Sequence, residues 1–163
     1  MRRPVAAVGS SVFFVIAPGV GAGLIPWWLT RWQVRQTAYL WGPVRLAAAV
    51  LVIAAVAVLV TAFLRFIVEG RGTPAPIAPT ENLVIGGLYR YVRNPMYVAV
   101  LAAIVGQAIA LWQFALLWYA AAVCVAFVTF VKLYEEPTLA RRFGAQYEEY
   151  RRTVRPWRPR WPK

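Results

Sequence analysis

The longest charge-free stretch of the chain limits its fold more than any other feature. Thirty-six consecutive residues, Met96–Val131, contain no Asp, Glu, Lys or Arg. This run is too long for one helix crossing about 30 Å of hydrocarbon and slightly short for two helices with a long loop. It therefore predicts a tight helical hairpin that turns near Trp112 and Gln113. Inside the hairpin, the polar side chain of Gln107 is expected to form an interhelical hydrogen bond, and the alternative is contact with a substrate.

Two further charge-free segments precede the hairpin. Val5–Thr30 is long enough to span a bilayer, and Pro18 predicts a kink or break within it. A secretory signal peptide is the competing interpretation, which we disfavour because the segment is long and ends in the interfacial pair Trp27 and Trp28. Leu46–Leu64 is long enough to span once.

The composition agrees with a membrane location. Of the 163 residues, 61% are hydrophobic, and the net charge is +12. A chain this apolar places basic side chains at membrane surfaces, so nucleic acid is not an expected partner. No His and no Asp occur, which removes the usual metal ligands and Ser-His-Asp chemistry, and the single Cys124 has no intrachain disulfide partner. We predict an all-α integral membrane protein with no metal.

The predicted spans divide one membrane domain, residues 1–163, into four parts. These are two N-terminal spanning helices in 1–67, a loop in 68–94, the hairpin in 95–134, and an amphipathic interfacial helix with a basic tail in 135–163. Apolar residues recur every three or four positions in that last helix. They are Leu139, Phe143, Tyr147, Tyr150 and Val154. With four spans, 15 basic residues lie on one side and 3 on the other, so the loop and C-terminus are predicted to be cytoplasmic.

A polar, aromatic stretch, Gly86–Tyr97, runs directly into the hairpin. Asn94 followed by Pro95 predicts a helix start, because the Asn side chain can accept from a free first-turn amide and Pro fits the first helical position. The positive end of this helix, with arginines beside it, suits an anionic group. The candidate ligand-binding residues are Tyr89, Arg90, Arg93, Asn94, Pro95 and Tyr97.

A carboxylate pair, Glu135 and Glu136, lies at the other end of the hairpin, so a closed hairpin brings it close to Arg93. Carboxylates are unfavourable at a helix C-terminus, and something must compensate them. One possibility is an interfacial ion pair with Arg90, Arg93 or Lys132. The other is a ligand that carries both signs of charge and vicinal hydroxyls, of which S-adenosylmethionine is one example. Residue chemistry alone leaves both open.

The Gly87–Tyr97 segment, the charge-free hairpin and the pattern that follows resemble two families, the isoprenylcysteine carboxyl methyltransferases and the phospholipid methyltransferases. That pattern is Glu135-Glu136-x-x-Leu139, Phe143-Gly144, Tyr147 and Tyr150. The resemblance covers roughly Pro79–Pro156. It implies a helical membrane enzyme that binds S-adenosylmethionine through Arg93, Asn94, Pro95 and Tyr97 in one motif and Glu135 and Glu136 in the other. This chain departs from the families in having Asn94 where His is common, Leu88 where Pro is frequent and Ala99 where Gly often stands.

The resemblance implies methyl transfer to a lipophilic or lipid acceptor, with Arg93, Asn94 and Glu135 as catalytic residues. A carboxylate acceptor is favoured because it is already deprotonated near pH 7, so the lack of histidine is harmless. A lipid amine would need a base, for which Glu135 or Glu136 is available. Two other classes stay open. They are an NADPH-dependent sterol or enone reductase, which resembles the same C-terminal pattern, and a non-enzymatic membrane scaffold or channel.

Overall fold

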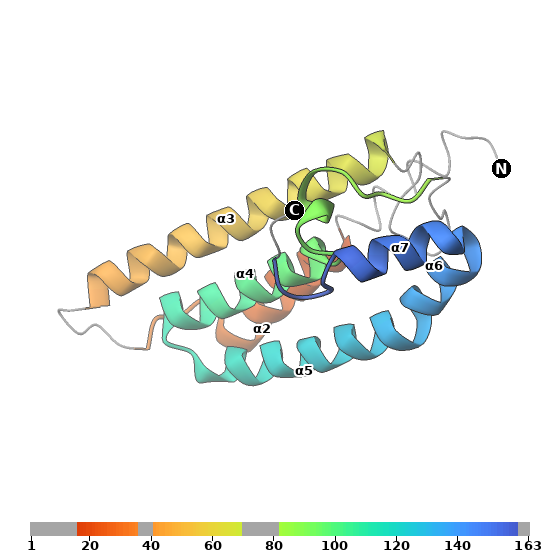
Figure 1. Ribbon diagram of the computed structural model, residues 1–163. Coiled ribbons are helices and arrows are strands. Elements are labelled where there is room, and N and C mark those ends of the chain that lie inside the picture. Colours follow the sequence, from red (N-terminus) through yellow and green to blue (C-terminus); the bar gives the residue numbers. More distant parts are fainter. Residues whose placement is uncertain (1–15, 36–40, 70–81, 160–163) are drawn as a thin grey trace.

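The computed structural model describes residues 16–35, 41–69 and 82–159, and within these ranges all regular structure is helical (Figure 1). A helix from Ile16 contains the π-helical turn η1 and continues as α2. The elements are η1 (Val20–Leu24), α2 (Ile25–Thr30), α3 (Trp41–Val68), the 3₁₀-helix η2 (Gly87–Arg90), α4 (Pro95–Leu111), α5 (Phe114–Phe130), the π-helical turn η3 (Val131–Glu135), α6 (Glu136–Phe143) and α7 (Ala145–Thr153).

Two helices of the bundle are long and apolar enough to cross a membrane, namely Trp41–Arg65 and Phe114–Phe143. Only 17% of the most apolar window of each is buried within the protein, so most of their apolar side chains face outward, as lipid contact requires. A third apolar helix, Pro95–Leu111, is shorter. Of the first predicted span only Ile16–Thr30 is described, and Val5–Val15 lie outside the described residues.

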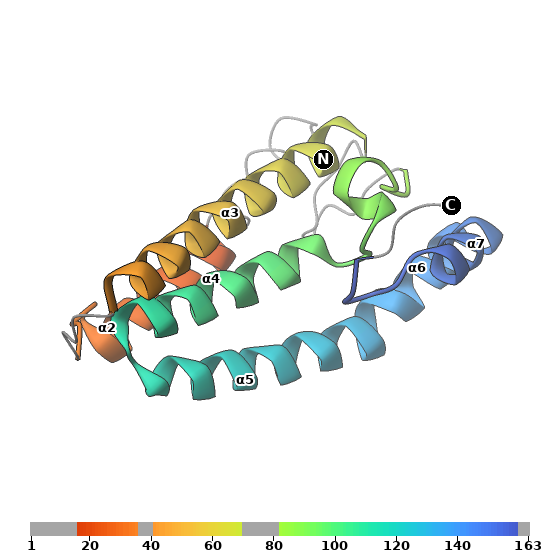
Figure 2. The same cartoon turned by 60° about the vertical axis from the view of Figure 1, so that its left-hand side comes forward.

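Helix α4 lies between α3 and α5 (Figures 1 and 2). Ala48, Ala55 and Ala62, spaced seven residues apart along α3, are each no more than 5% exposed. On α4, a Cβ added at Gly106 would lie 2.7 Å from a methyl carbon of Val52. Small side chains on both helices therefore let α3 and α4 approach closely, as in other membrane helix pairs.

The predicted hairpin is confirmed, with its turn at Trp112 and Gln113 between α4 and α5. The side-chain amide of Gln113 donates to the carbonyl of Gln33 (2.7 Å), and the ring of Trp112 packs edge-on against Trp41 (4.2 Å between centroids). Gln107 Nε2 donates to the carbonyl of Ala22 (2.7 Å), which is the predicted interhelical hydrogen bond.

The irregularity predicted near Pro18 takes the form of a π-helical turn rather than a break. The helix continues through Pro18, and η1 follows directly. A π-helical turn is an irregularity within a helix, and here the helix proceeds through it into α2 without ending.

The boundary predicted between residues 134 and 135 differs from the structure. The second arm of the hairpin does not end there, because α5 continues through η3 into α6 as far as Phe143. The amphipathic helix is interrupted instead at Gly144, which has a φ of 49°. After this break α7 lies near the start of α4 (Figure 2), and its Tyr147 is 2% exposed.

Candidate functional site

The start of α4 is held in place by the C-terminal tail. The backbone N–H of Arg93 donates to the carbonyl of Arg155 (2.9 Å), and that of Asn94 donates to the carbonyl of Pro156 (3.3 Å). No pattern in the sequence predicts this contact between the tail and the start of α4. These bonds fix the conformation of the segment that carries the candidate residues.

The guanidinium of Arg93 joins three helices. It forms an ion pair with Glu136 of α6 (Nη2 to Oε1, 3.0 Å) and donates from Nη1 to the hydroxyl of Tyr147 on α7 (3.1 Å). The side chain of Arg93 is 9% exposed, and its buried Nε has no hydrogen-bond partner among the described residues. One strong donor at this position is therefore left for a ligand.

Glu135 lies beside an aromatic cluster. The hydroxyl of Tyr97 donates to Glu135 Oε2 (2.8 Å). The Tyr97 ring packs against Phe127 of α5 (4.7 Å between centroids) and lies 6.4 Å from the ring of Trp157 in the tail. The two carboxylates thus have different partners, since Glu136 pairs with a cation and Glu135 with a neutral hydroxyl.

Asn94 occupies the predicted position before α4, but its side chain does not act as predicted. Pro95 is the first helical residue, as expected, whereas the Asn94 side chain forms no capping hydrogen bond. The backbone of Asn94 has φ −119° and ψ 56°, outside the extended conformation that brings a capping side chain to the first-turn amides. Asn94 is nevertheless 7% exposed, so its amide is buried beside the cluster.

Tyr89 lies in a small packed core beside α3, next to Ala62 and Val84. Its backbone carbonyl accepts from the hydroxyl of Tyr150 (2.8 Å). Burial is the main cause that raises the pKa of the Tyr89 and Tyr150 phenols above their usual value, so both remain neutral donors. Arg90 is exposed and lines a separate cavity with Arg65, so the structure does not bring Arg90 to the two carboxylates.

Three residues of the cluster were not among the predicted site residues. Tyr147 and Trp157 contact the arginine and the tyrosine of the first motif, as described above. Thr138, one turn after the carboxylates, has a buried hydroxyl with no partner among the described residues. For Tyr147 the sequence carried a signal, its place in the apolar stripe, which was attributed to packing alone. Trp157 and Thr138 carried none.

The comparison with known families covers the part of the chain that carries both motifs. The sequence model described as phospholipid methyltransferase matches residues 44–146, which is more than half of the chain and includes both motifs. The chain belongs to this family. It is therefore a membrane methyltransferase of the phospholipid and isoprenylcysteine group that uses S-adenosylmethionine, and its acceptor is a lipid. The reductase and non-enzymatic alternatives are not retained. No curated protein matches the chain.

Proposed function

We propose that this protein transfers a methyl group to the amine of a membrane lipid, at the cluster formed by Arg93, Tyr97, Glu135 and Glu136. The observation that carries the proposal is the difference between the two carboxylates. Glu136 is occupied by Arg93, whereas Glu135 forms no ion pair with a described residue and accepts only from Tyr97. One carboxylate is thus engaged in structure, and the other is available to receive a proton.

The residues of this cluster fit S-adenosylmethionine, which carries a carboxylate, an ammonium group and vicinal hydroxyls. Arg93 Nε, a buried donor without a hydrogen-bond partner among the described residues, suits the carboxylate. The carboxylate of Glu136, of which only Oε1 pairs with Arg93, keeps an acceptor oxygen that suits the ammonium group or the vicinal hydroxyls. Asn94, buried beside Arg93, supplies an amide that can both donate and accept. Pro95 and Tyr97 lie in the first turn of α4, next to Arg93 and Asn94 in the chain.

When bound, S-adenosylmethionine supplies an electrophilic methyl group, and the carbon–sulfur bond breaks with its electron pair left on sulfur as the acceptor nitrogen bonds to the carbon. The residues of the protein have two tasks. Glu135 takes the proton that the amine must lose, and general-base catalysis of this kind contributes about 10²- to 10⁴-fold. The Tyr97 hydroxyl holds one carboxylate oxygen of Glu135, which leaves the other free for that proton.

Arg93 and Glu136 contribute by positioning. Their ion pair joins α4 to α6, and the bond from Arg93 to Tyr147 adds α7, so the two motifs keep a fixed separation. Holding two reactants in line supplies up to about 7–11 kcal/mol of barrier reduction in well-oriented systems. No covalent nucleophile is required.

A carboxylate acceptor, as in the isoprenylcysteine enzymes, is the second candidate. The absence of histidine favours it, because a carboxylate needs no base. The charge of Glu135 opposes it, since a second carboxylate at the same place would be repelled. The matched family's description, phospholipid methyltransferase, also favours an amine-bearing lipid.

We further propose that the cluster faces the cytoplasm. The last turn of α3, η2 and α7 lie toward one end of the bundle, and the turn between α4 and α5 lies at the other (Figure 1). At that other end the N–H of Arg35 donates to the carbonyl of Leu111. The more basic end contains the cluster, and basic residues remain preferentially on the cytoplasmic side.

Transfer of a labelled methyl group by the purified protein tests the acceptor and the role of Glu135 together. We expect label in phosphatidylethanolamine and not in a prenylated cysteine. Glu135→Gln should slow transfer by about 100-fold or more, as expected for losing a general base, while S-adenosylhomocysteine still binds. Glu148→Gln, on the exposed part of α7, is the matched control. Label in the prenylated cysteine, at an unchanged rate in Glu135→Gln, would overturn the proposal.

A further inference from the structure

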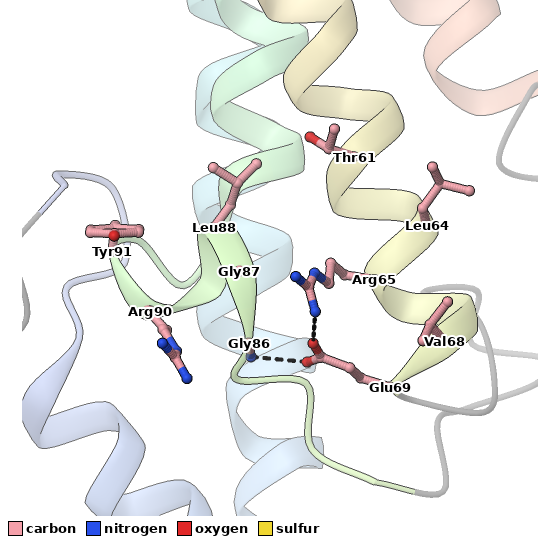
Figure 3. A pocket seen from close by; sticks show the side chains of 10 residues that line it. All are labelled: Thr61, Leu64, Arg65, Val68, Glu69, Gly86, Gly87, Leu88, Arg90 and Tyr91. Carbon is pink, nitrogen blue, oxygen red and sulfur yellow. Dashed lines mark hydrogen bonds and ion pairs between the residues drawn. The ribbon is translucent and has the colours of Figure 1, made fainter.

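A cavity lies between the last turns of α3 and the 3₁₀-helix η2, and neither Glu135 nor Glu136 lines it (Figure 3). Its volume is about 690 Å³, within the range of pockets that hold small molecules. The candidate spanning segment Trp41–Arg65 ends at this cavity. It therefore lies at the level where hydrocarbon gives way to lipid headgroups.

The polar wall of this cavity is built around Glu69. Its Oε1 forms an ion pair with Arg65, and its Oε2 accepts from the backbone N–H of Gly86 (3.0 Å), so both carboxylate oxygens are engaged. A Cβ at Gly86 would lie 2.1 Å from Glu69 Oε1, and one at Gly87, which has a φ of 57°, would lie 2.8 Å from Arg65 Nε. The absence of side chains at both glycines, and the positive φ of Gly87, let the loop lie close to Glu69 and Arg65.

Positive charge remains in the cavity after this pairing. Arg65 and Arg90 both line it, and Figure 3 shows them on either side of the Gly86–Gly87 turn. Glu69 offsets one of the two charges. Arg90 is exposed and forms no ion pair within the described part of the chain. Two arginine forks with unused donors favour a tetrahedral anion such as phosphate.

The rest of the wall is apolar. Leu64 and Val68 line the cavity from α3 and are 51% and 72% exposed, and Leu88 lines it from η2. The outward face of α3 toward the bilayer carries further exposed apolar side chains, among them Val60. A ligand in this cavity would thus contact cations at the membrane boundary and apolar side chains next to them. A phospholipid has the matching order of groups, with an anionic phosphate followed by apolar acyl chains.

We propose that this cavity binds the phosphate of a membrane phospholipid, with Arg65 and Arg90 as its ligands and the acyl chains along α3. The site goes beyond the proposed methyl transfer, because it concerns the phosphate and not the methylated group. Glu69 and the two glycines act as positioning residues that hold Arg65 in place.

Thermal unfolding of the detergent-purified protein tests the site without any methyl transfer. The probe is dihexanoylphosphatidylglycerol, which has a phosphodiester and no amine, so its binding is independent of the proposed reaction. Its addition should raise the Tm of the wild type in a saturable manner, since a ligand that binds only the folded state stabilises it. Dihexanoylglycerol, which lacks the phosphate, and inorganic phosphate should each raise the Tm less than dihexanoylphosphatidylglycerol does.

Variants then separate the cavity from general attraction to a basic surface. Arg90→Gln leaves the bonds of Glu69 intact and should raise the apparent Kd for the lipid about tenfold or more, as expected for losing a charge-assisted hydrogen bond. Arg65→Lys keeps the charge but not the fork, and should weaken binding as well. The control is Arg141→Gln, an exposed arginine on α6.

Three outcomes would each overturn the proposal. In the first, Arg141→Gln weakens lipid binding as much as Arg90→Gln does, which would indicate attraction to the basic surface. In the second, the neutral diacylglycerol stabilises the protein as strongly as the phospholipid, so the phosphate has no role. In the third, inorganic phosphate alone matches the lipid, which would make the cavity a site for a free anion. Loss of methyl transfer with lipid binding unchanged would concern the proposed function alone.

Discussion

At the residue scale, Arg93 connects the start of α4 to three other parts of the molecule. Its backbone N–H donates a hydrogen bond to the carbonyl of Arg155 in the tail. Its side chain contacts Glu136 on α6 and Tyr147 on α7. An arginine can make these contacts together because its guanidinium is planar and has five donors in fixed directions. A lysine has a single side-chain nitrogen, which cannot take the positions of both guanidinium nitrogens that contact Glu136 and Tyr147.

We predict that Arg93→Lys lowers the affinity for S-adenosylhomocysteine about tenfold or more, because one charge-assisted hydrogen bond contributes about 1.5–3 kcal/mol. Isothermal titration of the purified variant measures this. Arg142→Lys, at an exposed position on α6, should bind like the wild type. Wild-type affinity in Arg93→Lys would limit Arg93 to a structural role.

The approach of Arg93 to the carboxylate pair was predictable from the sequence. A closed hairpin must bring together residues that lie at similar distances from its turn on the two arms, as Arg93 and the carboxylate pair do. The behaviour of Asn94 was not predictable in this way. Its backbone conformation depends on the bond from its N–H to Pro156, a residue 62 positions away, and no local rule contains that contact.

At the element scale, the contact between α3 and α4 depends on Gly106. The nearest atoms to a Cβ at this position are the Val52 methyl carbon at 2.7 Å and the backbone carbonyl oxygen of Ala48 at 3.2 Å. The carbonyl oxygen cannot move without moving α3. Any larger residue must therefore separate the two helices.

Gly106→Val is predicted to destabilise the protein by about 1–3 kcal/mol, the usual cost of overpacking a close contact. The Tm in detergent should fall accordingly. Gly42→Val, at a glycine with open space around it, is the matched control and should leave the Tm nearly unchanged. Adding Val52→Ala to Gly106→Val should recover part of the loss, because it removes the nearest atom. If the single variant were as stable as the control, close packing at Gly106 would not contribute.

The continuation of the hairpin into α6 shows what element-level sequence reasoning missed. Glu135, Glu136 and Pro137 together suggested that the helix ends there. In the structure the π-helical turn η3 precedes Pro137, which lies at the start of α6, where its missing N–H is tolerated. Glu135 and Glu136 belong to a helix that continues beyond its apolar part. A change from apolar to polar residues marks the end of the apolar part, but it does not show whether the helix itself ends there.

At the scale of the whole molecule, the bundle has two chemically different ends. One end contains the hairpin turn, fixed by the contacts of Trp112 with Trp41 and of Gln113 with Gln33. The other contains the carboxylate cluster, the lipid-phosphate cavity and α7. The apolar runs predicted this separation, since each span must begin at one surface and end at the other. Which surface faces the cytoplasm depends on charge, and the count of 15 basic residues against 3 predicts it.

Cysteine labelling in intact cells tests this orientation. Replacing the single native cysteine by Cys124→Ser gives a background without thiols, in which Arg35→Cys and Gln146→Cys each introduce one exposed thiol, at opposite ends of the bundle. Neither change reverses the charge difference, so both variants should insert as the wild type does. A membrane-impermeant maleimide should label Arg35→Cys in intact cells and Gln146→Cys only in inverted vesicles. The opposite pattern would place the carboxylate cluster outside the cytoplasm, away from the cellular supply of S-adenosylmethionine, and would contradict the orientation proposed for the site.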